Sequence, residues 1–261
     1  IYMSRIENAF RNKKAFITFV TVGDPDIETT EKLIYAMEEA GADLIEIGIP
    51  FSDPVAEGII IQEADERALK NGCTTDKIFD MVERVRKNTD IPLALMTYLN
   101  PVYTYGKSKF MSRCEAGGID GIIVPDMPYE EKEELEGVCK QHGVDLISMI
   151  SPNSKDRAVM IAESAGGFLY CVSSLGVTGV RHDINMEIGD LIKKVKEVNS
   201  IPCAIGFGIS TPQQAREMAA ISDGVIVGSA IVKIVAEHGI DSIEPVKAYV
   251  KSMKDAIENL V

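Results

Sequence analysis

Three acidic residues lie within one short segment of the chain, and their spacing suits proton transfer. Glu46 interrupts the apolar run at residues 44–49, which is typical of a strand buried on both faces. Its carboxylate therefore points into protein, where it serves either a structural ion pair or chemistry. Asp53 and Glu57 follow on a segment whose two prolines predict a loop. An acid at the end of a buried strand, with others on the next loop, can form an acid/base pair.

Strands and helices alternate along the whole chain around this segment. β-Branched and apolar runs predict strands at residues 15–22, 44–48, 91–97, 121–124, 146–150, 168–172, 202–206 and 224–227. Helical periodicity predicts a short opening helix with Ile6 and Phe10, then helices at residues 27–40, 61–70, 75–87, 106–116, 130–142, 155–165, 184–198, 211–219, 230–237 and 243–260. Eight such units in about 250 residues are typical of a barrel, whereas a doubly wound open sheet is less favoured because no Gly-x-Gly-x-x-Gly motif leads the chain. We therefore predict an α/β fold, a (β/α)8 TIM barrel with an extra N-terminal helix and additional short helices, in which residues 1–261 form a single domain.

The composition excludes several kinds of partner. The net charge of −13 repels nucleic acids and anionic membranes at long range, so we expect neither. No apolar run approaches the roughly 18 residues that span a bilayer, and no leader precedes a cleavage site, so we expect a cytoplasmic protein. Five cysteines are scattered without a Cys-x-x-Cys spacing and predict neither disulfides nor a metal site. An anionic substrate would have to be held by backbone N–H groups.

Glycine-rich segments after the last two predicted strands indicate where such an anion would bind. Gly206-Phe207-Gly208 lets backbone N–H groups approach a ligand, Thr211-Pro212 has the chemistry of a helix N-terminus, and Gly228-Ser229 opens a second helix. A phosphate group held between the loops after strands seven and eight is a recurring arrangement of barrels. Since the carboxyl ends of all eight strands share one face, residues distant in sequence should converge there.

Two other segments at this face can each be interpreted in two ways. Residues 174–179 are small and flexible, and they form either a surface loop or a lid that closes over a substrate. Asp126, between two prolines, either forms a turn or contacts a ligand. Tyr98 and Tyr170 suit the walls of a pocket better than they suit acid chemistry, because an unperturbed phenol titrates near pH 10.

These motifs resemble the tryptophan synthase α subunit family. Residues 46–58 read Glu-Ile-Gly-Ile-Pro-Phe-Ser-Asp-Pro-Val-Ala-Glu-Gly and are similar to the family signature Glu-(Leu/Ile)-Gly-x-Pro-Phe-Ser-Asp-Pro-x-Ala-Asp-Gly-Pro. Blocks at residues 19–25, 125–128, 176–179, 206–210 and 228–230 also match in order and spacing. The resemblance implies a lyase that cleaves indole-3-glycerol phosphate to indole and glyceraldehyde 3-phosphate in a retro-aldol reaction. It implies no cofactor in this chain and a partner β subunit that carries pyridoxal phosphate, in an α2β2 assembly.

The resemblance also implies roles for individual residues. It matches Glu46 to the general acid/base and Glu57 to the acceptor of the indole N–H, and the apolar walls of the slot would raise the pKa of Glu46. Contacts with the β subunit are expected at Asp53 and Pro54. Substrate contacts are expected at Phe19, Leu95, Tyr98, Asp126, Tyr170, Thr178, Gly179, Phe207, Gly208, Gly228 and Ser229.

Two departures from the family signature leave the activity open. Glu57 stands where the family has Asp, and the extra methylene moves the carboxylate by about 1 Å, which can cost on the order of a hundredfold in rate. Ile59 replaces a proline and leaves the loop less restrained. The chain is then an adapted lyase that releases free indole, a slow α subunit, or an engineered or reconstructed variant. Two other interpretations are a regulatory partner that signals through the loops of Asp53 and Thr178, and another phosphate-binding barrel such as an isomerase.

Overall fold

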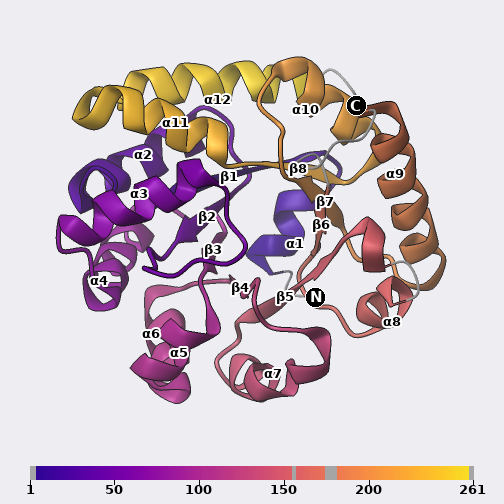
Figure 1. The fold of residues 1–261 in the computed structure, drawn as a ribbon, viewed down its shortest axis with the longest axis horizontal. Coiled ribbons are helices and arrows are strands. Elements are labelled where there is room, and N and C mark those ends of the chain that lie inside the picture. Colours follow the sequence, from indigo (N-terminus) through magenta and orange to yellow (C-terminus); the bar gives the residue numbers. More distant parts are fainter. Residues whose placement is uncertain (1–3, 155–156, 174–180, 259–261) are drawn as a thin grey trace.

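Eight parallel strands close into a barrel in which each strand pairs with its sequence neighbours and β8 returns to β1 (Figure 1). The structure is a computed structural model that describes residues 4–154, 157–173 and 181–258. The strands are β1 (Ala15–Thr21), β2 (Leu44–Gly48), β3 (Leu93–Met96), β4 (Gly121–Ile123), β5 (Asp145–Ile150), β6 (Leu169–Val172), β7 (Cys203–Gly206) and β8 (Gly224–Val227). The predicted TIM barrel is confirmed.

The helices surround the barrel on its outer side, except that the first lies inside the ring of coils (Figure 1). They are α1 (Arg5–Phe10), α2 (Ile27–Glu39), α3 (Ile59–Lys70), α4 (Thr75–Arg86), α5 (Leu99–Tyr105), α6 (Lys107–Gly117), α7 (Glu133–Gln141), α8 (Ala158–Glu163), α9 (Arg181–Val198), α10 (Pro212–Ile221), α11 (Ser229–His238) and α12 (Ile243–Glu258). Short 3-10 turns lie at Tyr129–Glu131, Pro152–Ser154 and Gly239–Asp241. No helix within the described ranges has the length and apolar character needed to cross a membrane.

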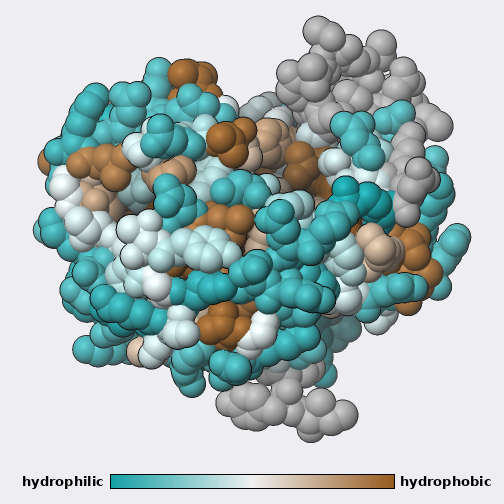
Figure 2. All heavy atoms as spheres, turned by 60° about the horizontal axis from the view of Figure 1, so that its bottom comes forward, coloured by the Kyte–Doolittle hydropathy of each residue, from teal (hydrophilic) through white to brown (hydrophobic). Residues whose placement is uncertain are grey.

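Side chains inside the barrel alternate with side chains that face the helices, because successive residues of a strand point to opposite sides. On β1, Ile17 and Phe19 belong to the inner cluster, whereas Phe16 and Val20 belong to the outer one. The outer cluster between strands and helices is the larger, and burying each of its large side chains contributes roughly 1.5–3 kcal/mol. Most of the surface in the view of Figure 2 is hydrophilic, with small separate hydrophobic patches.

Helix α1 closes the amino-terminal end of the barrel. Ile6 is fully buried and belongs to the inner cluster, and the ring of Phe10 packs on Phe168 with 5.6 Å between centroids. Ser4 and Glu7 form a capping box that fixes the start of this helix. The carboxyl-terminal end of the barrel is the end that remains available for a ligand.

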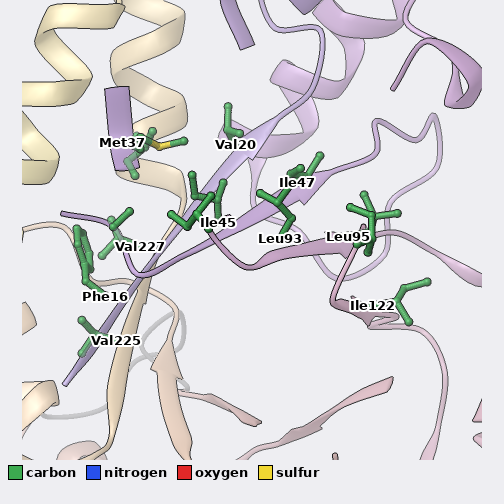
Figure 3. Close-up of a cluster of buried hydrophobic side chains, with 14 of the residues drawn as sticks. Phe16, Val20, Met37, Ile45, Ile47, Leu93, Leu95, Ile122, Val225 and Val227 are labelled. Atoms are coloured by element: carbon green, nitrogen blue, oxygen red, sulfur yellow. The ribbon is translucent and has the colours of Figure 1, made fainter. Parts of the chain in front are cut away.

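Leu95 does not face this interior, which corrects the prediction that it lines a substrate slot. Its neighbours Ala94 and Met96 belong to the inner cluster, so Leu95 points outwards and packs with Ile47 and Ile122 beneath the helices (Figure 3). The strand was correctly identified, but the face on which this side chain lies was not.

Helix α5 is not among the predicted helices, because its short segment with Pro101 shows little helical periodicity. The proline occupies the first turn of the helix, where a missing N–H costs no hydrogen bond. The carboxylate of Asp126 accepts a hydrogen bond from the Leu99 N–H at 3.0 Å and so caps the helix from outside. A sequence gives no sign of a cap that comes from another loop.

Candidate active site

A cavity of about 570 Å³ opens at the carboxyl ends of the strands, a size suited to a small organic ligand. Eight predicted site residues line it: Phe19, Glu46, Glu57, Tyr170, Phe207, Gly208, Gly228 and Ser229. They come from strands β1, β2 and β6 and from the segments that follow β2, β7 and β8, so the convergence expected of a barrel is present.

Glu46 lies at the centre of β2 and points into the barrel. It is fully buried, and neither carboxylate oxygen has a hydrogen-bond partner within the described residues. Its neighbours in register are Phe19 and Ala94, which bring no charge. Burial raises the pKa of Glu46 to about 8, which suits a group that takes up and returns a proton near neutral pH.

Glu57 enters the same cavity from the loop after β2. Its Oε2 atom is buried without a hydrogen-bond partner within the described residues, and burial raises the pKa of this carboxyl group. Two contacts hold the loop: the Ala56 N–H donates to the Tyr98 hydroxyl oxygen at 3.1 Å, and the Gln62 side-chain amide donates to the Glu57 carbonyl at 2.7 Å. Tyr98 therefore supports the loop and is not among the cavity-lining residues, where we had expected it.

Asp65, on α3, lies against Glu57 and was not predicted as a site residue. It is 3% exposed, and its Oδ2 accepts a hydrogen bond from the Phe51 N–H at 3.3 Å. Burial, followed by the charge of Glu57, raises the pKa of Asp65. The signal in the sequence was an acid on the apolar face of an amphipathic helix, an arrangement that needs a partner.

Two glycines make room for the aromatic walls of the cavity. A Cβ at Gly48 would lie 2.5 Å from the Phe19 ring, and one at Gly206 would lie 2.5 Å from the Tyr170 hydroxyl oxygen. Tyr170 is buried, and burial raises its pKa well above the ordinary value, so its phenol stays protonated. Both rings line the cavity together with Glu46.

Backbone N–H groups gather at the other end of the cavity. Phe207 and Gly208 both have positive φ, 86° and 71°, which is unusual for a phenylalanine, and both line the cavity. Helix α11 starts at Ser229 with Gly228 as its cap residue and no side chain bound to its first N–H groups. Such a helix start attracts an anion.

The start of α10 differs from this prediction. Thr211 and Gln214 form a capping box, and the Gln214 side-chain oxygen accepts hydrogen bonds from Ser210 and Thr211. These donors are already used, so the backbone N–H groups still available at this end of the cavity are those of residues 207–208 and of the start of α11. Lys233, one turn into α11, also lines the cavity and adds a positive charge that was not predicted.

The remaining predicted residues lie in three different situations. Asp126 caps α5 and does not line the cavity. Thr178 and Gly179 lie outside the described residues. Asp53 is exposed and Pro54 is half-buried on the loop after β2. Residues that line the cavity without having been predicted include Ile60, Ile61, Met96, Met149, Ser151 and Ser154.

No group of three or more His, Cys, Asp or Glu residues within the described parts of the chain is arranged to hold a metal ion. All five cysteines are free and buried. The cavity therefore combines buried carboxyl groups and apolar walls with the free backbone N–H groups at the start of α11.

A TIM barrel with a buried acid on β2 and a phosphate-type site after β7 and β8 defines a class of barrel enzymes that act on phosphate esters. Comparison with known proteins identifies the family within this class. Residues 6–259 match the family model of the tryptophan synthase alpha chain, and the chain belongs to this family.

Relatives and solved structures agree with this family over nearly the whole chain. The tryptophan synthase alpha chain of Lacticaseibacillus casei is 44% identical over 98% of this chain and 96% of its own length. The crystal structure of tryptophan synthase subunit alpha from Legionella pneumophila str. Paris superposes with a TM-score of 0.90 at 36% identity and covers 99% of this chain and 100% of its own. A chain from the Pyrococcus furiosus tryptophan synthase a2b2 complex has a TM-score of 0.87 at 36% identity, over 93% of this chain and 98% of its own.

Proposed function

We propose that this chain cleaves indole-3-glycerol phosphate to indole and glyceraldehyde 3-phosphate in the cavity above Glu46, as an α subunit in tryptophan biosynthesis. The observation that carries the proposal is the pairing of a fully buried, unpartnered Glu46 with an anion site at the far end of the same cavity. Membership of the family agrees with a carbon–carbon lyase.

Each end of the substrate has a counterpart in the cavity. The phosphate group binds the N–H groups of Gly208 and Ser229, with Lys233 nearby, so the overall charge of −13 is no obstacle. The indole ring lies between Phe19 and Tyr170. Its N–H then faces Glu57, and the carbon chain between ring and phosphate lies across Glu46.

Glu46 is the proposed general acid/base. Its carboxylate accepts the proton of the side-chain hydroxyl and delivers the same proton to the ring carbon that bears the side chain. While that carbon is protonated, positive charge develops at the ring nitrogen, and the Glu57 carboxylate offsets it by accepting the N–H. The carbon–carbon bond then breaks: its electron pair returns to the ring and restores the indole, and the side-chain oxygen becomes that of the aldehyde.

Glu57 in place of Asp lowers the rate less than its extra methylene suggests, in this proposal, because the loop holds it by specific contacts. The hydrogen bonds from Ala56 and Gln62 set the loop, and the longer side chain reaches the cavity, which it lines. We expect measurable cleavage without any added cofactor.

The proposed partner is a β subunit in an α2β2 assembly, which carries the pyridoxal phosphate and joins indole to serine. A solved complex of this composition exists for the Pyrococcus furiosus relative. Asp53 and Pro54, on the loop that carries Glu57, are the proposed contacts, and the exposed Val55 beside them, 78% accessible, suits an interface. The free, buried cysteines agree with a cytoplasmic setting.

The test is to incubate the purified chain with indole-3-glycerol phosphate and to follow indole and glyceraldehyde 3-phosphate, with and without a β subunit. Release of both products in equal amounts by the chain alone supports the lyase. Activity only with the β subunit supports a slow α subunit that its partner activates. Tight substrate binding with no cleavage under either condition supports the regulatory alternative and overturns the proposal.

A further inference from the structure

The segment after β7, which lines the anion end of the cavity, contains one unfavourable backbone conformation. Phe207 has φ of 86°, a value that a residue with a Cβ rarely adopts and keeps only where its surroundings hold it. Packing of the side chain does little to hold it, because Phe207 is 43% exposed. The conformation therefore depends on contacts of the backbone.

Ser173 makes these contacts from the end of the neighbouring strand. It follows Val172, which pairs with Gly206 in the register of β6 and β7. Its hydroxyl oxygen lies 2.9 Å from the Phe207 carbonyl oxygen and 3.1 Å from the Gly206 carbonyl oxygen, and its N–H donates to the latter at 3.0 Å. The Gly206 carbonyl thus already accepts an N–H, whereas the hydroxyl is the donor that the described residues offer to the Phe207 carbonyl.

A contact that fixes this carbonyl also fixes an N–H group of the cavity. The Phe207 carbonyl and the Gly208 N–H belong to one planar trans peptide unit, so they point in opposite directions. Ser173 is buried and does not line the cavity, whereas Gly208 does. Among the described residues, none accepts a hydrogen bond from the Gly208 N–H. A carbonyl that accepts a hydrogen bond also makes the N–H of its own peptide unit a stronger donor.

We propose that Ser173 is a positioning residue whose hydroxyl holds the Phe207 carbonyl away from the cavity and so directs the Gly208 N–H at the phosphate group of the substrate. The inference rests on the proposed function and deepens it, because it makes phosphate binding depend on a side chain that does not touch the ligand. Loss of the hydroxyl should weaken binding of the phosphate end and leave binding of the indole ring unchanged, since the ring lies between Phe19 and Tyr170 in the proposed arrangement.

Ser222 provides a matched control at the other end of the barrel. It is buried, and its hydroxyl oxygen lies 2.8 Å from the carbonyl oxygens of both Met218 and Gly224. It precedes β8 at the amino end of that strand and does not line the cavity. Ser222→Ala therefore removes the same kind of buried hydrogen bond as Ser173→Ala, but at the end of the barrel opposite the phosphate site.

The experiment titrates the two halves of the substrate separately into the full chain, with NMR as the readout of binding. Glycerol 3-phosphate represents the phosphate end, and indole represents the ring. For Ser173→Ala we expect the dissociation constant of glycerol 3-phosphate to rise about tenfold and that of indole to change by less than about twofold. For Ser222→Ala we expect both constants to stay within about twofold of the unaltered chain. Both variants should lower the urea midpoint of unfolding, because each loses a buried hydrogen bond.

Ser173→Cys is the second variant, which keeps the test decisive should Ser173→Ala fail to fold. It replaces the hydroxyl by a thiol of similar size that is only a weak donor. We expect its glycerol 3-phosphate binding to weaken by at least about threefold while its indole binding stays unchanged.

Three outcomes would overturn the inference while the proposed function stands, with the unaltered chain still releasing indole from indole-3-glycerol phosphate. These are unchanged binding of glycerol 3-phosphate by the folded Ser173 variants, an equal loss of binding for indole and glycerol 3-phosphate, or the same selective loss in Ser222→Ala. If the unaltered chain binds neither glycerol 3-phosphate nor indole-3-glycerol phosphate, the proposed function itself fails.

Discussion

At the scale of single residues, the chemistry of this site depends on two acidic residues, Glu46 and Glu57, whose burial disfavours the charged form of the carboxyl group. Glu46 has no hydrogen-bond partner in the described structure and no neighbouring cation to stabilise its ionised form. Removing a carboxylate from water in this way costs stability, and the folded state avoids much of the cost by keeping the proton. The same property makes the group an effective proton carrier near pH 8.

Glu46→Gln should therefore stabilise the protein at alkaline pH. Because the pKa of Glu46 is higher in the folded than in the unfolded chain, the folded state holds the extra proton between about pH 4.5 and about pH 8. Stability then falls as pH rises through this window, by at most about 1.4 kcal/mol per unit, and the variant lacks this fall. Urea unfolding at pH 5 and pH 9 measures it: the gain should be present at pH 9 and small at pH 5. Equal stability of both proteins at pH 9 would show that Glu46 is not strained.

The unaltered enzyme should gain activity with rising pH, since the base form of Glu46 is populated only as pH approaches about 8. We expect the acid limb of the kcat profile near that value, and Glu46→Gln should lose at least about a hundredfold in kcat. An acid limb near pH 4 would contradict the assignment of Glu46 as the base in an apolar pocket.

Glu57→Gln tests the acceptor of the indole N–H. The amide keeps the size of the side chain but removes the charge that offsets the developing positive charge, so kcat should fall by about 10- to 100-fold. Glu63→Gln, at an exposed position on α3 six residues after Glu57, is a suitable control and should leave kcat unchanged. Near-normal turnover by Glu57→Gln would show that the carboxylate is not needed.

At the scale of secondary-structure elements, the strand ends decide which side chains reach the cavity. Gly48 and Gly206 leave room for an aromatic ring from the neighbouring strand. The ring of Phe19 lies against Gly48, and the ring of Tyr170 lies against Gly206. Helix α11 contributes uncapped N–H groups, whereas the neighbouring α10 is capped by its own side chains. Two helices that both follow glycine-containing strand ends thus differ in the N–H groups that they leave free for an anion.

Gly48→Ala should disturb the substrate slot specifically. The new methyl group would meet the Phe19 ring at about 2.5 Å, so the ring must shift into the cavity that it lines. We expect a loss of about 1–3 kcal/mol in stability, from overpacking, and a rise of about tenfold in KM. Gly137→Ala, on α7 with open space around the site of the new Cβ, is the matched control and should be neutral or slightly stabilising. Unchanged KM in Gly48→Ala would mean that the ring does not contact the substrate.

At the scale of the whole molecule, the two ends of the barrel have different roles: one is packed for stability, and the other carries the cavity. Helix α1 seals the amino-terminal end with Ile6 and Phe10, and the carboxyl-terminal end carries every residue assigned to the reaction. Stability at one end can therefore be changed without touching the chemistry at the other.

Ile6→Ala should show this separation. It removes a fully buried side chain from the inner cluster and should destabilise the protein by about 2–5 kcal/mol, measured by urea unfolding. At a temperature where the variant remains folded, kcat should stay within about twofold of the unaltered enzyme. Ile240→Ala, at a position that is 67% exposed, is the control and should change stability by less than about 0.5 kcal/mol. A large fall in kcat for folded Ile6→Ala would show that the two ends are coupled.

The sequence by itself determined the barrel, the positions of its strands, the buried acid on β2 and the glycine-rich segments after β7 and β8. These features are local: alternation of strand and helix, an acid inside an apolar run, and glycines at strand ends can be recognised over ten or twenty residues. Several helix ends shifted by up to three residues, since caps and short 3-10 turns decide them.

Only the tertiary structure decided which of these residues share the cavity. Leu95 and Met96 are neighbours in sequence, yet the pleat of β3 places one beneath the helices and the other at the cavity. Asp126 caps α5 and Tyr98 holds the Ala56 loop, roles that require partners from other parts of the chain. Asp65 of α3 holds the preceding loop at the Phe51 N–H, and there its burial and the nearby charge of Glu57 raise its pKa, an effect that depends on how the loop and the helix pack and exclude water.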